Sequence, residues 1–213
     1  MKLLIACEES GIVRESFRSM GINAYSCDLL QSSIPSLYHF QCDIFELLEN
    51  EKFDAMIAHP PCERLTVAAN KYYLPQYADR FPNIHKERKA AIEFFLKLAT
   101  YPIKHKAIEN PIGIMSKLYR KPNQIIQPFW FGDGERKATC LWLEGLPNLQ
   151  PTNIVQPDII IHKSGRTDSR LHFETLKLPP IERRKARSKT FPGIAAAMAK
   201  QWSEYINSIK QVA

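Results

Sequence analysis

The chain has 213 residues, of which 45% are hydrophobic and 24% charged, a composition typical of a soluble globular protein with one α/β domain and room for a small addition. Its apolar runs are shorter than the ~18 residues that a membrane span needs, and Glu8 and Glu9 end the apolar N-terminus, so we expect neither a membrane helix nor a signal peptide. The net charge of +7 favours a polyanionic partner, with nucleic acid the first candidate.

The first half of the sequence alternates short apolar runs with helical patterns, which predicts a mostly parallel sheet with helices on both faces. Strands are expected at 2–7, 23–27, 40–42, 54–58 and 106–108. Helices are expected at 12–20 and 84–101, where Gly21 and Pro102 end the patterns.

The second half is less regular. Segments 127–132 and 138–143 are expected to pair as antiparallel strands around a Gly-Asp-Gly turn, and 192–209 to form a helix. We therefore predict three parts: a main α/β domain over 1–146, a small basic region over 147–187, and a C-terminal helix over 188–213 that packs back on the main domain.

Polar side chains follow each predicted strand, at the edge of a parallel sheet where ligands bind. They are Cys7 and Glu8, Asp28, Asp43, His59 to Cys62, and Glu109 with Asn110. After the second strand, Asp28 is placed to accept hydrogen bonds from ribose hydroxyls, and after the third, Asp43 from an adenine amino group. The alternative role for each aspartate is a helix cap or a solvated turn.

The turn Glu8-Glu9-Ser10-Gly11 stands where a nucleotide-binding sheet carries its glycine-rich loop. One glycine and two carboxylates disfavour a pyrophosphate and are compatible with a cationic ligand. S-adenosylmethionine carries a sulfonium and an ammonium and no phosphate, so it is the expected cofactor.

The five cysteines are widely spaced and form no CxxC pair, which favours free thiols in a reducing compartment and disfavours a zinc site built from such pairs. Four of them suit buried packing. Cys62 differs because Pro60 and Pro61 precede it, and this stiff dipeptide can hold a nucleophilic thiol over a pocket. Glu109, at the next strand end, is suited to give a proton to a ring nitrogen.

These residues resemble the DNA cytosine-C5 methyltransferases, and more narrowly their compact phage and prophage members. "HPPC" at 59–62 resembles the Pro-Cys nucleophile motif of the family, and "IENP" at 108–111 its Glu-Asn-Val motif. The order of the motifs also matches. "FGDGERKATCLWL" at 131–143 resembles the segment of the Gln-x-Arg-x-Arg motif, and "RSKTFPGIAAAMAKQW" at 187–202 the C-terminal motif.

The resemblance implies a Rossmann-like class I S-adenosylmethionine-dependent methyltransferase fold that forms 5-methylcytosine in DNA, with the target base flipped out of the duplex. It implies that Cys62 adds to C6 of cytosine, that Glu109, with Asn110 beside it, engages N3, and that Arg136 stands in for the family arginine that Thr139 replaces. The cofactor contacts are expected from Cys7, Glu8, Ser10, Gly11, Asp28, Asp43 and Pro60. The substrate contacts are expected from His59, Lys137, Arg183, Arg184, Lys185 and Arg187.

Alternatives remain open. Region 147–187 is much shorter than the recognition domains of full-length relatives, which suits weak sequence specificity, single-stranded DNA, RNA or a free pyrimidine nucleotide. An amino-methyltransferase is disfavoured because its [DNS]-Pro-Pro-[YFW] motif would have His59 and Cys62 at its variable places. A catalytically impaired nucleic-acid-binding protein fits the altered glycine loop and Thr139, and the retention of Cys62 and Glu109 speaks against it.

The expected setting is the cytoplasm of a bacterial or phage-infected cell, in a restriction-modification role. We expect a monomer or weak dimer without a metal or a membrane partner. The tyrosines at 72, 73 and 77 follow the cysteine loop and suit either stacking on a base or packing.

Overall fold

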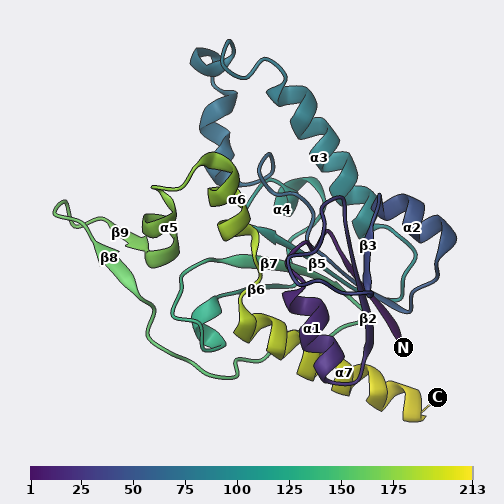
Figure 1. Cartoon of the computed structure of the whole chain (residues 1–213). Coiled ribbons are helices and arrows are strands. Elements are labelled where there is room, and N and C mark those ends of the chain that lie inside the picture. Colours follow the sequence, from purple (N-terminus) through teal and green to yellow (C-terminus); the bar gives the residue numbers. More distant parts are fainter. Residues whose placement is uncertain (213) are drawn as a thin grey trace.

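The computed structural model describes residues 1–212, which form a central seven-stranded sheet and a smaller projecting part (Figure 1). The strand order is β3-β2-β1-β4-β5-β7-β6. The strands are β1 (Lys2–Ala6), β2 (Asn23–Asp28), β3 (His39–Gln41), β4 (Ala55–Ala58), β5 (His105–Pro111), β6 (Gln124–Ile126) and β7 (Thr139–Glu144). Five strands are parallel from β3 to β5, and β7 runs antiparallel to both of its neighbours. The expected doubly wound, mostly parallel α/β sheet is confirmed.

The register of the parallel strands brings their carboxyl ends to one edge. Ala6 of β1 is level with Cys27 of β2 and with Ala58 of β4, and Ala58 is level with Ile108 of β5. The residues that follow these four positions therefore stand at the same edge of the sheet. Strand order reverses between β1 and β4, which is the switch point where open α/β sheets bind their ligands.

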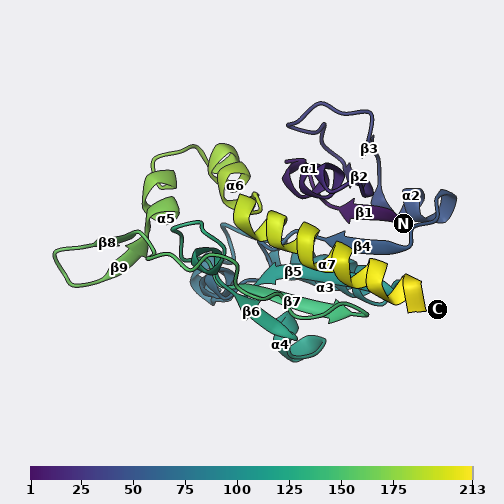
Figure 2. The ribbon, with the colours of Figure 1, turned by 90° about the horizontal axis from the view of Figure 1, so that it is seen from below.

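One face of the sheet is covered by α1 (Ile12–Ser19) and the long α7 (Pro192–Val212), which lies along the strands in Figure 2. The other face is covered by α2 (Ile44–Asn50) and α3 (Ile84–Ala99). Successive side chains of β1 alternate between the two faces, as a strand with both faces buried requires. Leu3 packs with Phe17 and Trp202, whereas Leu4 packs with Phe95.

Each such buried side chain contributes about 1.5–3 kcal/mol relative to an exposed one. Residues of α7 therefore stabilise the same core as β1 and α1, although they lie at the other end of the chain.

The predicted division into 1–146, 147–187 and 188–213 stays a prediction.

The antiparallel pair of the second half exists, but the prediction of its first strand was wrong. The strand that pairs with β7 is β6, with Gln124 level with Leu141, and not segment 127–132. Pro128 begins the one-turn 3-10 helix η3 (Pro128–Trp130). A proline has a fixed φ and no N–H, which suits the first turn of a helix, so the chain turns into η3 there and β6 ends before it.

Several short elements lie outside the main sheet. The 3-10 helices η1 (Val67–Tyr73) and η2 (Pro75–Tyr77) follow β4, and α4 (Met115–Leu118) follows β5. The projecting part contains the hairpin of β8 (Ile159–Ile161) and β9 (Thr167–Ser169), followed by α5 (Arg170–Thr175) and α6 (Pro180–Ser188). Figure 1 shows α6 near the loops at the carboxyl edge of the sheet, with the hairpin farther out. None of the helices in residues 1–212 is long and apolar enough to cross a membrane.

Candidate functional site

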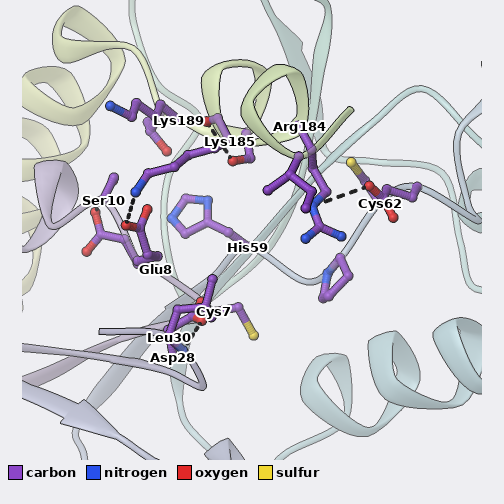
Figure 3. Close-up of a pocket in the computed structure, with 16 residues that line it drawn as sticks. Cys7, Glu8, Ser10, Asp28, Leu30, His59, Cys62, Arg184, Lys185 and Lys189 are labelled. Atoms are coloured by element: carbon purple, nitrogen blue, oxygen red, sulfur yellow. Dashed lines mark hydrogen bonds and ion pairs between the residues drawn. The ribbon is translucent and has the colours of Figure 1, made fainter. Parts of the chain in front are cut away.

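A pocket of about 310 Å³ opens at the carboxyl edge of the sheet, at the switch point between β1 and β4 (Figure 3). One wall consists of the loops that follow β1 and β4. The opposite wall is α6 with the two residues beyond it, Lys189 and Thr190. The pocket therefore lies between the sheet edge and the projecting basic part.

A second pocket of about 150 Å³ adjoins the first, because Cys7, Asp28 and Pro61 line both. Its remaining lining includes Asp43 and two apolar side chains, Ile44 and Phe94. The two pockets together can accept an elongated ligand with a polar end in the larger space and a flat apolar end in the smaller one.

Glu8 stabilises the N-terminus of α1 from inside the protein. Its carboxylate is 4% exposed and accepts the backbone N–H groups of Val13 at 2.6 Å and Arg14 at 3.2 Å. These are amides that would bind a phosphate in a dinucleotide-binding sheet. Burial raises the pKa of Glu8, although the charge of His59 and both amides act in the opposite direction. A phosphate would meet a carboxylate here, so the site disfavours nucleoside phosphates.

The turn that carries Glu8 has an unusual backbone at two positions. Gly11, the residue before α1, has φ of 76°, and a Cβ there would lie 2.7 Å from the side chain of Arg14. Cys7 has φ of 58°, in the left-handed region that non-glycine residues rarely adopt. Such strain persists where the surrounding structure enforces it, and it is common at ligand sites. Ser10 is buried and donates its hydroxyl to Glu8.

Asp28 and Asp43 each line the smaller pocket and each also stabilise the backbone. Asp28 Oδ1 accepts the N–H of Leu30, and burial raises its pKa. Asp43 is the N-cap of α2 and accepts two amides through Oδ1. Its other oxygen makes no hydrogen bond within residues 1–212. The cap role that the sequence left as an alternative is thus real for Asp43, and it leaves one carboxylate oxygen free for a ligand.

The loop after β4 holds Cys62 at the larger pocket. Pro60 is buried, and its carbonyl oxygen accepts a hydrogen bond of 2.9 Å from the side-chain amide of Asn110. Pro61, rather than Pro60, lines both pockets. Burial and, to a smaller extent, the charge of Glu109 raise the pKa of the Cys62 thiol to about 11, against the opposing charge of Lys137. The thiol is therefore protonated near neutral pH when no ligand is bound.

His59 and Glu109 form a hydrogen-bonded pair beside this cysteine. His59 Nδ1 lies 2.9 Å from Glu109 Oε2, and the two side chains are 10% and 16% exposed. Burial acts to raise the pKa of Glu109, but the hydrogen bond and charge of His59, together with the charge of Lys137, outweigh it and lower the pKa. Glu109 is thus ionised at neutral pH.

Lys137, and not its neighbour Arg136, is the cation that acts on these groups. Its ammonium donates to the carbonyl oxygen of Arg187 at 2.7 Å, and its charge lowers the pKa of both Cys62 and Glu109. Arg136 is exposed and stands outside the lining of both pockets. Its expected catalytic role stays a prediction.

The four basic residues predicted on segment 183–187 divide into two pairs. Arg184 and Lys185 line the larger pocket, where Arg184 lies 3.7 Å from Glu63 and Lys185 lies 2.9 Å from Glu9 (Figure 3). Arg183 and Arg187 point into the projecting part instead and hold α5 and the turn after it. Arg183 donates to the carbonyl oxygens of Thr175, Leu176 and Leu178. Arg187 donates to the hydroxyl of Thr175 and the carbonyl oxygen of His172.

Sequence reasoning missed several residues at the site. Glu9, Glu63 and Lys189 line the larger pocket, and Pro61 lines both. The fully buried Arg14 was also missed, although it donates to Ser26, Ser32 and the carbonyl oxygen of Ile34 and so holds the loop between β2 and β3. Two of these roles were signalled in the sequence, that of Glu9 by its position beside Glu8 and that of Pro61 by its position before Cys62.

The three tyrosines after the cysteine loop contact other side chains. Tyr72 packs edge-on against Tyr77 and Phe81, and the guanidinium of Arg88 lies 3.7 Å from the ring centre of Tyr73. These contacts agree with the packing role. Within residues 1–212, no group of three or more potential metal ligands is present.

Solved structures similar to this chain include three methyltransferases. A protein described as a DNA modification methyltransferase encoded within an E. coli prophage has a TM-score of 0.45 and 14% identity, covering 73% of this chain and 52% of its own. The Entamoeba histolytica methyltransferase EhMeth has a TM-score of 0.44 and 15% identity, covering 75% and 58%. A Spodoptera frugiperda DNMT2 mutant has a TM-score of 0.42 and 15% identity, covering 74% and 57%.

This chain thus spans between half and three-fifths of the length of these structures. No family model matches its sequence, and no curated protein does.

Proposed function

We propose that this protein is an S-adenosylmethionine-dependent methyltransferase that forms 5-methylcytosine in DNA through a covalent bond between Cys62 and C6 of the base. The observation that carries the proposal is the coupling of Cys62 and Glu109 at neighbouring strand ends. The charge of Glu109 acts on the thiol, and the hydrogen bond from Asn110 to Pro60 joins their two segments. A nucleophile beside a carboxyl group is what addition to a pyrimidine requires.

The residues at the two pockets fit S-adenosylmethionine. Glu8 occupies the helix N-terminus with negative charge, which suits an ammonium or sulfonium and opposes a phosphate. Asp28 is placed for the ribose hydroxyls, and the free oxygen of Asp43 for an adenine amino group between Ile44 and Phe94. When bound, this cofactor supplies an electrophilic methyl group to the activated C5 of the base.

The protein's own groups divide the remaining work. The Cys62 sulfur loses its proton to water and bonds to C6, while the electrons of the C5–C6 double bond shift toward C5. Glu109, which is hydrogen-bonded to His59, engages N3. After C5 has been methylated, a base removes the C5 proton, its electron pair restores the double bond, and the sulfur leaves.

A basic wall faces these groups. Arg184, Lys185 and Lys189 stand across the larger pocket from Cys62 and the loop after β1. Cations at this place favour a substrate with phosphates next to the target base, which supports nucleic acid as the substrate.

The test is nucleoside mass spectrometry on DNA from a host without its own cytosine methylation. We expect 5-methylcytosine with the wild type and none with Cys62→Ala. Cys140→Ala is the matched control, because Cys140 is fully buried in β7 and lies outside the lining of both pockets. Absence of 5-methylcytosine with a folded wild type overturns the proposal for DNA. The same analysis of RNA and of free nucleotides then tests the alternative substrates.

A further inference from the structure

His59 lines the larger pocket and joins it to Glu109 at the end of β5. Its ring donates or accepts through Nδ1 at 2.9 Å from Glu109, and its charge, when present, acts on Glu8 across the loop after β1. The side chain is only 10% exposed, and its Nε2 is buried without a hydrogen-bond partner among residues 1–212. Figure 3 shows the imidazole projecting into the pocket.

The state of Glu109 raises a chemical difficulty for the proposed reaction. Nitrogen N3 of cytosine becomes more basic when sulfur adds to C6, and a proton delivered to N3 stabilises the adduct. An ionised carboxylate only accepts hydrogen bonds and has no proton to give. Because Glu109 is held ionised in the free protein, the proton for N3 must come from another group.

We propose that His59 holds the proton that Glu109 delivers to N3, so that the two residues act together as one acid. This inference rests on the proposed function and assigns a positioning and proton-holding residue to that reaction. The geometry supports it because the 2.9 Å contact is a direct path for a proton from Nδ1 to Oε2.

The charges around His59 are compatible with this role. Glu109 at the end of β5 and Glu8 after β1 attract a positive charge on the ring, and Lys137, whose charge acts on Glu109, repels it. On the wall formed by α6, Arg184 and Lys185 are paired with Glu63 and Glu9, which reduces their effect on the ring. The thiol of Cys62 is neutral until it reacts.

The proton balance closes over one cycle. As the sulfur of Cys62 bonds to C6, the proton on Nδ1 of His59 passes to Oε2 of Glu109, and the proton of the Glu109 carboxyl passes to N3. His59 is then neutral, and Glu109 is again a carboxylate. When the sulfur leaves, N3 gives its proton back to Glu109 and from there to His59.

The decisive variant is His59→Asn. The Asn amide nitrogen takes the place of Nδ1 and still donates to Glu109, but it carries no proton that it can transfer. His85→Asn is the matched control, because His85 is exposed and lies outside the lining of both pockets. If His59→Asn does not fold, as judged by its melting curve, His59→Gln is used in its place.

The measured quantity is the rate of covalent adduct formation with DNA that contains 5-fluorocytosine, over a range of pH. With S-adenosylmethionine present, C5 is methylated and then carries fluorine in place of the proton that a base would remove, so the sulfur cannot leave and the persistent adduct is counted as a shifted band. We expect His59→Asn to react about 10²-fold more slowly, the lower end of what proton transfer contributes. His85→Asn should match the wild type.

The pH profile separates proton delivery from a merely structural role. The thiolate fraction of Cys62 rises tenfold per pH unit up to about 11. The wild-type reaction needs this thiolate and also the proton that His59 holds, and the two requirements oppose each other, so its rate should rise less steeply with pH. The Asn side chain of His59→Asn has no transferable proton that a higher pH could remove, so the logarithm of its rate should keep rising with pH.

A second measurement does not depend on activity. The pKa of Glu109, followed by the ¹³C shift of its carboxyl group, should be higher in His59→Asn, because the charge of His59 is one cause of its low value.

A wild type that forms adduct while His59→Asn shows the same rate and profile overturns the inference and leaves the proposed function standing. A wild type that forms no adduct overturns both.

Discussion

The side-chain amide of Asn110 donates a 2.9 Å hydrogen bond to the carbonyl oxygen of Pro60, and with the His59–Glu109 contact it joins the strand end that carries Glu109 to the loop that carries Cys62. Both partners are buried. A buried carbonyl that loses its donor pays its full desolvation cost, so the contact restricts the loop strongly. This amide therefore helps to fix the relative position of the nucleophile and the acid.

Replacement of that amide should affect reaction more than folding. We expect Asn110→Ala to lower the free energy of unfolding by about 1–3 kcal/mol, because the carbonyl of Pro60 is left without a partner. Adduct formation should fall by about 10²-fold, the effect of a misplacement near 1 Å. Asn50→Ala is the control, because Asn50 also donates to a carbonyl but is exposed. Unchanged adduct formation in Asn110→Ala would show that the loop is held by other contacts.

The reactivity of Cys62 should follow its charged neighbours. With a pKa of about 11, its thiolate fraction at pH 8 is about one part in a thousand, so alkylation by iodoacetamide should be slow and rise tenfold per pH unit. Glu109→Gln removes a charge that raises the pKa and should speed alkylation. Lys137→Gln removes a charge that lowers the pKa and should slow it.

Peptide mass spectrometry distinguishes Cys62 from Cys7, whose pKa is raised by burial to about 12 and which should react more slowly. Lys104→Gln, at an exposed position, serves as the control for loss of a positive charge. Slower alkylation in Glu109→Gln together with faster alkylation in Lys137→Gln would contradict the electrostatic account.

The buried carboxylate of Glu8 predicts a pH-dependent stability. Glu8→Gln should lower the free energy of unfolding by about 1 kcal/mol at neutral pH, because it weakens the cap of α1. Burial raises the pKa of Glu8, so between 4.5 and its native value the folded state binds more protons than the unfolded state. The wild type therefore gains stability as the pH falls through this window, and the variant does not.

The difference between wild type and Glu8→Gln should thus widen from neutrality toward pH 4.5, as measured by urea unfolding. Glu46→Gln is the matched control, since Glu46 lies in the first turn of α2 but is exposed. A difference that narrows instead would mean that the pKa of Glu8 is lowered in the folded protein.

Adjacent basic residues of α6 should have different roles. Arg184→Ala and Lys185→Ala should weaken DNA binding, measured by fluorescence anisotropy, and reduce the slope of log K against log salt by about 1 for each lost phosphate contact. Arg183→Ala should lower the melting temperature instead, because it removes three hydrogen bonds to carbonyl oxygens of α5 and the turn after it. If Arg183→Ala and Arg184→Ala weaken DNA binding equally and leave the melting temperature unchanged, the assignment of Arg184 to binding and of Arg183 to stability is wrong.

Much of the sheet edge could be predicted from the sequence. Parallel strands with level ends bring Cys7, Asp28, His59 and Glu109 together whatever the loops do, so the pattern of strand ends was sufficient. The cap role of Asp43 could also be foreseen, because an Asp before an apolar helical pattern accepts the first amides.

The role of each basic residue could not be predicted. Arg183 and Arg184 are neighbours of the same type, and only the packing of α6 against α5 turns one toward the carbonyl oxygens and the other toward the pocket. Lys137 acts on Cys62 and donates to the carbonyl oxygen of Arg187, whereas its neighbour Arg136 is exposed, and this difference too depends on contacts between distant parts of the chain. The strand before Pro128 was misjudged because the apolar run continues through a residue that ends the hydrogen-bonding pattern.

The three residues that both pockets share also have a consequence for ligand design. A molecule can place a flat ring in the smaller pocket and a pyrimidine-like group in the larger one, with a linker that lies against Cys7 and Asp28. Once one end is bound, the other is held near its own pocket at an effective concentration in the millimolar range for a short linker. Two fragments that each bind weakly would therefore combine into one tight, two-headed inhibitor.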